Sequence, residues 1–173
     1  LKFSTQNGIL YCDGNVCFVP DHNSFAESAP LETVHNIDVE IGGKKSNLEE
    51  CVKDLFGGIY SLDGKSFVKW DGHTSVKSYS VRPGVEKICN DAFWEQTGTG
   101  NGDHGLPLRE RILPHSLKYI GKEAFRATSL NELRLPSEIK EIDDRAFLNC
   151  QVLETILLPD SIKRLGKFAF AGS

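Results

Sequence analysis

The chain has 173 residues, which is within the usual size of one domain and long enough to bury a sizeable core. Apolar residues make up 39% and charged residues 25%, and the formal net charge is −4. This charge gives no electrostatic reason to expect nucleic acid as a partner. No apolar run approaches the roughly 18 residues that a membrane-spanning helix needs, so we expect no membrane span.

The chain starts at Leu1 and contains no methionine, so we expect it to be a fragment of a longer protein. Its five cysteines are an odd number without a CxxC motif, which argues against a disulfide scaffold or a zinc site. Whether one disulfide forms, between Cys12 and Cys17, stays open. A turn in "YCDGNVCF" that places Cys12 opposite Cys17 would allow it, whereas a turn on Asp13-Gly14 puts the two residues out of register.

Three elements are expected in the N-terminal part. Residues 7–20 and 57–70 each have β-rich apolar flanks around Asp-Gly, which predicts two β-hairpins. Between them, residues 47–56 follow a capping box (Ser46 with Glu49) and repeat apolar residues at helical spacing before Gly57. This pattern predicts one short amphipathic helix over 47–56.

The last third of the chain repeats itself. "LRERILPHSLKYIGKEAF", "LNELRLPSEIKEIDDRAF" and "LETILLPDSIKRLGKFAF" follow one another at steps of 22 and 23 residues. A fourth, looser copy lies upstream in residues 79–93, and a polar, glycine-rich insertion at 95–105 separates it from the others. We expect this insertion to be a surface loop.

The repeat unit has a readable physical meaning. Its Leu-x-x-Leu-x-Leu segment ends in alternation typical of a short strand with one buried face, and the proline ends that strand. One unit cannot bury its own apolar edge, so successive units must stack into a solenoid. A period of 20–29 residues with this pattern is typical of leucine-rich repeats.

Residues 79–173 resemble the BspA-like (Treponema pallidum-type) leucine-rich repeats, with the pattern L-x-x-I-x-L-P-x-S-V-x-x-I-G-x-x-A-F-x-x-C. "LETILLPDSIKRLGKFAF" follows it closely, and "AFLNC" supplies the family's cysteine as Cys150. The hairpin predicted at 57–70 also looks like the one that often precedes such repeats. The resemblance implies a secreted or surface-exposed protein of bacteria, or of some parasitic protists, that contacts host proteins, matrix or other cells.

These observations predict a β-rich leucine-rich-repeat solenoid of about four repeats, with N-terminal β-hairpins and one short helix. We expect residues 1–78 to cap the N-terminal end and residues 79–173 to form the repeats, as one continuous domain. The array stops at "FAFAGS" without a capping segment, so the apolar edge of its last coil is exposed. We therefore expect the polypeptide to continue or to self-associate through this edge.

Candidate binding residues lie on the outward face of the strands, where stacking aligns them in columns. A column of Ile112, Arg134 and Leu157 puts two aliphatic side chains beside an arginine, which is typical of protein-contact patches. That these residues are only strand formers, or pack on a neighbouring segment, stays open. The other candidates are Arg109, Asn131 and Glu154 in a second column, with Trp94 near the 95–105 loop.

Catalytic and metal sites are not indicated. The five histidines are scattered in predicted loops, and "GNGDHG" at 100–105 holds one carboxylate, too few for a hard cation. "EIDDRAFLNC" at 141–150 holds three acids, but the sister copies have Gly-Lys in place of Asp143-Asp144. We interpret these two residues as a solvated turn, with Lys122 and Lys167 as charge partners.

The sequence thus predicts a non-catalytic, adhesin-like module that binds proteins outside the cell or at its surface, without a cofactor. Two alternatives remain. The first is an architectural spacer within a larger surface protein. The second is an enzymatic or metal-dependent site in residues 1–78, where the candidate residues are Asp21, His22, His35, Asp38, Glu40 and His73.

Overall fold

The computed structural model describes residues 3–6, 9–12, 15–18, 31–71, 78–94 and 110–173. For residues 3–6, 9–12, 15–18, 78, 110–112 and 132 it describes only the backbone. Fifteen strands and no helix occur within these ranges. No helix in this part of the chain is therefore long and apolar enough to cross a membrane.

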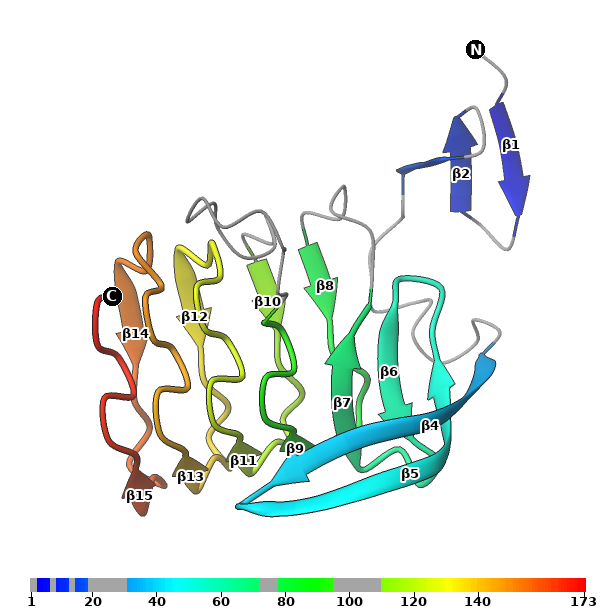
Figure 1. The fold of residues 1–173 in the computed structure, drawn as a ribbon. Coiled ribbons are helices and arrows are strands. Elements are labelled where there is room, and N and C mark those ends of the chain that lie inside the picture. The colour runs from blue at the N-terminus through cyan, green and yellow to red at the C-terminus, as the bar shows by residue number, and fades with distance from the viewer. Residues whose placement is uncertain (1–2, 7–8, 13–14, 19–30, 72–77, 95–109) are drawn as a thin grey trace, which may run out of the picture.

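The largest element is an eight-stranded sheet in the order β15-β13-β11-β9-β7-β6-β5-β4 (Figure 1). The half of the sheet that comes first in the chain is antiparallel. It consists of the long strands β4 (Glu32–Ile41) and β5 (Lys44–Lys53) and the shorter strands β6 (Gly58–Ser61) and β7 (Ser66–Trp70). The second half of the sheet is parallel and consists of two-residue strands, β9 (Lys87–Ile88), β11 (Tyr119–Ile120), β13 (Glu141–Ile142) and β15 (Arg164–Leu165).

A second set of short parallel strands forms another side of each coil. β8 (Ser78–Ser80) pairs with β10 (Glu110–Ile112), and β12 (Glu132–Arg134) pairs with β14 (Thr155–Leu157). The coils follow one another side by side from β8 to the C-terminus (Figure 1). In each of the last three, a proline follows the strand and accepts a hydrogen bond from the amide three residues on, which turns the chain toward the other sheet. The predicted solenoid is confirmed.

The predicted hairpins are present. Residues 57–70 contain the antiparallel pair β6–β7, and residues 7–20 contain β2 (Ile9–Cys12) and β3 (Asn15–Phe18), which form a separate sheet with β1 (Phe3–Gln6). The backbone register pairs Cys12 with Asn15, so Cys17 does not lie opposite Cys12 in the ladder. The side chains of both cysteines lie outside the described part, and their disulfide stays a prediction.

The predicted helix at 47–56 is wrong, because most of this segment is strand β5. Gly42 and Gly43 both have positive φ, 56° and 77°, which closes a two-residue turn between β4 and β5. Strand β5 then pairs with β4 on one side and with β6 on the other. A helix of ten residues is marginal by itself, and two ladders of long-range hydrogen bonds outweigh its local preference.

A column of stacked phenylalanines runs through the core. Neighbouring ring centroids in the series Phe67, Phe93, Phe125, Phe147 and Phe170 lie 4.6, 4.8, 5.1 and 5.1 Å apart, with interplanar angles of 15° or less. These spacings match the distance between paired strands. The first ring belongs to β7, so the β6–β7 hairpin supplies the first layer of the solenoid.

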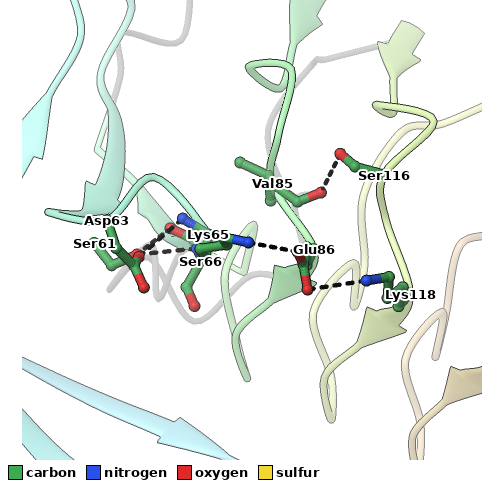
Figure 2. A network of polar contacts seen from close by, with 8 residues as sticks. All are labelled: Ser61, Asp63, Lys65, Ser66, Val85, Glu86, Ser116 and Lys118. Carbon is green, nitrogen blue, oxygen red and sulfur yellow. Dashed lines mark hydrogen bonds and ion pairs between the residues drawn. The ribbon is translucent and has the colours of Figure 1, made fainter.

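Polar side chains also connect this hairpin to the repeats (Figure 2). The Glu86 carboxylate accepts hydrogen bonds from Lys65 Nζ at 2.7 Å and from Lys118 Nζ at 3.1 Å, and so joins the hairpin turn to two successive coils. Ser116 Oγ donates to the Val85 carbonyl at 2.7 Å. The two ion pairs are exposed to solvent, so each contributes little to the free energy of unfolding.

Each coil contains a residue in the left-handed region at the same place. Asp91, Glu123, Arg145 and Phe168 have φ between 54° and 57°. Their amides, except that of Phe168, donate to a carbonyl of the following coil. The left-handed backbone points the amide at the carbonyl of the next coil, and in the first three coils this hydrogen bond offsets the backbone strain.

We predict that Phe147→Ala lowers the free energy of unfolding by about 3–5 kcal/mol, because it leaves a cavity between two stacked rings. Phe168→Ala is the matched control, since Phe168 is 66% exposed and should change stability by less than about 1 kcal/mol. Chemical denaturation followed by circular dichroism measures both. Equal losses for the two variants would show that the ring stack does not support the fold.

Candidate functional site

The outward face of β12 and β14 carries the predicted contact column. The parallel register places Arg134 beside Leu157, with the inward residues Leu133 and Ile156 next to them. Leu157 is 70% exposed, more than any other large apolar side chain in the described part of the chain, and Arg134 is also exposed. The strands therefore alternate inward and outward side chains as the sequence predicts.

The other predicted residues are only partly described. Asn131 and Glu154 are exposed neighbours in successive coils, joined by a 3.0 Å hydrogen bond from the Glu154 amide to the Asn131 carbonyl. The backbone of Ile112 pairs with Ser80, while its side chain and the whole of Arg109 lie outside the described residues.

Trp94 has different surroundings from the β12–β14 pair. It is half-buried, and the guanidinium of Arg126 lies 4.8 Å from the centroid of its ring. Arg126 also forms a 2.7 Å ion pair with Glu123, which restrains the guanidinium in its position over the Trp94 ring. The structure thus divides the predicted residues between two surfaces.

The acidic stretch at 141–150 is part of the scaffold, but the interpretation of Asp143 as a solvated turn residue is wrong. Asp143 is 8% exposed and accepts hydrogen bonds from the Tyr119 hydroxyl at 2.7 Å and from Arg164 Nη2 at 2.9 Å. Asp144 accepts from the backbone amide of Lys167 at 2.7 Å. The expected lysine ammonium groups are therefore not the partners of these carboxylates.

This network has an electrostatic consequence. Burial acts to raise the pKa of Asp143, but the hydrogen bonds from Tyr119 and from the Asp144 amide, together with the Arg164 guanidinium, hold the pKa below its ordinary value. Burial and the neighbouring Asp143 carboxylate raise the pKa of Tyr119. Because the carboxylate is bound by partners in the preceding and the following coil, it joins three successive coils.

The described residues contain no cluster of metal-ligating side chains. No three His, Cys, Asp or Glu side chains lie close enough there to hold a metal ion. His35, Asp38 and Glu40 are described, whereas Asp21, His22, His73 and the 100–105 loop lie outside. Cys51 and Cys89 are buried thiols, and burial raises the pKa of Cys89 to about 12, so it is not a nucleophile at neutral pH.

A groove lies where the β4–β5 hairpin meets the first coil. It has a volume of about 760 Å³, and its lining comes from both hairpin strands, from β7 and from the turn after β9. The Asn90 amide donates to the Glu40 carbonyl at 3.0 Å, and the Gly42 amide donates to the Tyr119 hydroxyl at 3.2 Å. These two bonds fix the hairpin against the first two coils and define the width of the groove.

Sequence reasoning found Trp94 but missed this groove. Several of its polar residues come from the β4–β5 hairpin, whereas the sequence pattern predicts a helix over 47–56. Alternating apolar residues at Ile37, Val39 and Ile41 before Gly42-Gly43 are the local signal that indicates the hairpin.

Parallel coils, short strands on two sides and a continuous aromatic column together define a leucine-rich-repeat solenoid. Residues 104–173 match the family model described as "BspA type Leucine rich repeat region (6 copies)". This region of the chain therefore carries BspA-type leucine-rich repeats, and the expected resemblance is confirmed. Upstream of it, β9 pairs with β11 and the ring of Phe93 stacks on that of Phe125. The looser copy therefore has the same architecture.

One similar solved structure supports the same fold, and two others are more distant. The pneumococcal vaccine antigen PcpA matches with a TM-score of 0.59 and 25% identity, over 69% of this chain and 27% of that chain. Leucine-rich repeat proteins from Bacteroides ovatus ATCC 8483 and Eubacterium ventriosum ATCC 27560 match at 29% and 15% identity, with TM-scores of 0.42 and 0.30. They cover 60% and 81% of this chain, and 30% and 53% of their own. No curated protein matches the chain.

We predict that Asp143→Asn removes about 1–3 kcal/mol of stability at neutral pH, because the neutral amide cannot pair with Arg164. Since the folded-state pKa of Asp143 is lowered, its contribution is complete above the unfolded pKa of about 3.9 and is lost as the pH falls below that value. Urea unfolding at several pH values measures this contribution as the pH-dependent difference between wild type and Asp143→Asn.

Asp144→Asn is the matched control. Asn90 occupies the equivalent position in the first coil, and its side-chain oxygen accepts from the Lys122 amide at 3.0 Å. An asparagine at 144 can therefore keep the bond to the Lys167 amide. A loss of stability as large as that of Asp143→Asn, or no pH dependence in the difference, would contradict the assignment.

Proposed function

We propose that this chain is a non-catalytic protein-binding module of a cell-surface or secreted protein. It contacts host, matrix or other cell-surface proteins through the outward face of β12 and β14, and the sequence columns add Ile112 and Arg109 as candidate contact residues. It acts by docking alone, without a covalent step or a cofactor.

The observation that carries this proposal is the exposure of Leu157 beside Arg134 on a paired, rigid ladder. At 70% exposure, Leu157 leaves most of its apolar surface in water. An aliphatic group next to arginine is a typical composition of protein–protein interfaces. Because the strands are already ordered by hydrogen bonds to neighbouring coils, binding there costs little conformational entropy.

The comparisons support the class of function. Leucine-rich-repeat solenoids offer extended, rigid surfaces whose usual work is binding. The similar solved structure PcpA is described as a vaccine antigen, which supports a surface or secreted location for this chain. The chain spans 27% of that protein, so the partners of the antigen are not transferred to this chain.

We further propose self-association through the last coil. In the parallel ladder, Ile142 is fully buried, whereas its neighbour Leu165 in the last strand is 49% exposed. Leu158 and Phe168 of the same coil are also exposed. A second copy of the chain that covers this apolar edge removes it from water.

We predict that Leu157→Asp and Arg134→Glu each weaken capture of a partner protein at least about tenfold, because they place a carboxylate in the contact patch. The measurement is surface plasmon resonance of the chain over immobilised fibronectin, laminin and collagen. Leu62→Asp is the control, since Leu62 is a leucine of comparable exposure, 61%, outside the repeats. Capture that is unchanged in both strand-face variants removes this face from the proposal.

We predict that the chain associates in a concentration-dependent way in sedimentation velocity experiments. Leu158→Asp combined with Leu165→Asp should keep it monomeric, because two charges in the edge cannot be buried without a partner. Arg134→Glu should leave the association unchanged. A monomer at every concentration would refute self-association by this edge.

A further inference from the structure

The groove between the β4–β5 hairpin and the first coil has an apolar floor and an aromatic side. Val39 and Val68, both nearly buried, line its base, and the half-buried Trp94 lines one wall. The contact with Arg126 holds the indole in place. The groove therefore offers preorganised apolar surface to the flat, C–H-bearing face of a ligand.

The rim of the groove carries hydrogen-bonding groups of both kinds. Asn47 Nδ2 donates to Asp38 Oδ1 at 2.8 Å, which orients an amide and a carboxylate side by side. The side-chain oxygen of Asn90 accepts from the Lys122 amide, so its NH₂ group is left to donate. All three side chains line the groove.

Four charged side chains complete the rim: the carboxylates of Glu40 and Asp91 and the ammonium groups of Lys45 and Lys69. None of the four makes a hydrogen bond or an ion pair through its charged group with any residue of the described ranges. They are acceptors and donors without a hydrogen-bond or ion-pair partner among the described residues. With Asp38, the groove holds three carboxylates and two ammonium groups, so its charge nearly balances.

This balance discriminates between classes of ligand. A polyanion would meet three carboxylates, and a polycation would meet two ammonium groups. A metal ion does not fit, because no three of the described acidic, histidine or cysteine side chains converge. A hydroxyl group both donates and accepts, so a ligand with many hydroxyls uses carboxylate, amide and ammonium groups at once.

We propose that this groove binds a neutral oligosaccharide, with one sugar ring packed on Trp94 and its hydroxyls bonded to the polar rim. This site is separate from the β12–β14 face, and its ligand is of a different class from the protein partner proposed above. It exists only where the hairpin is fixed to the first coil, so it is a property of the N-terminal end of the solenoid.

The test uses isothermal titration calorimetry with maltotetraose, xylotetraose and N-acetylchitotetraose as probes. We expect saturable binding of at least one of them, with a Kd between about 10 µM and 1 mM. Intrinsic fluorescence gives a second readout, since the chain has two tryptophans and Trp70 is buried in the core. The emission of Trp94 should change with the same Kd.

Two variants place the site. Trp94→Ala and Asn47→Ala should each weaken binding about fivefold or more, while the strand-face variant Leu157→Asp should bind the sugar as wild type does. Asn47 is exposed, so its variant keeps the fold, which circular dichroism verifies. Because Leu157→Asp affects only the protein-binding proposal, failure of one proposal is distinguishable from failure of the other.

Three results would overturn the proposal. The first is no saturable binding of any of the three sugars up to about 10 mM. The second is sugar binding that both groove variants leave unchanged. The third is saturable binding of tetralysine, lost in Trp94→Ala, without binding of any sugar, which would identify the groove as a site for basic peptides.

Discussion

The spacing between neighbouring coils is the constraint on which the rest of this structure depends. Phenylalanine rings of successive layers lie 4.6–5.1 Å apart, which is the separation that parallel backbone ladders impose. A Cβ at Gly166 would lie 2.3 Å from the backbone of the preceding coil, and one at Gly121 would lie 2.7 Å from it. Glycine at these positions and a left-handed residue in each turn are consequences of this tight stacking.

Within the described residues, the first and last layers of this stack have different surroundings. At the N-terminal end, Phe67 of the β6–β7 hairpin provides the first ring, and the long β4–β5 hairpin lies against the first two coils. At the other end, Phe170 has a ring on one side among the described residues, and Leu165 is half exposed. The first end gains a groove with uncommitted polar groups, and the last coil presents an apolar edge.

The positions proposed for binding and those that carry the fold can be separated within the repeat. Ile88, Ile120 and Ile142 occupy one buried column, where only an aliphatic side chain of similar volume fits. Outward positions such as Arg134 and Leu157 differ from coil to coil without a cost to the core. Asp143 belongs to neither class, because a polar residue at a variable corner became a buried connector once Tyr119 and Arg164 were stacked around it.

The sequence by itself determined the repeat, the solenoid, the strand ends before proline, two hairpins and the alignment of Arg134 with Leu157. All of these follow from spacings along the chain that recur or lie within about 20 residues, so local patterns reveal them. Only the tertiary structure decided that residues 44–53 form a strand, that Asp143 is buried, and that a groove meets Trp94. Each depends on contacts between segments that lie far apart in the chain or in successive coils, such as Glu40 with Asn90 and Gly42 with Tyr119. Their free energy exists only after the coils have stacked, and for residues 44–53 it outweighs the local helical preference.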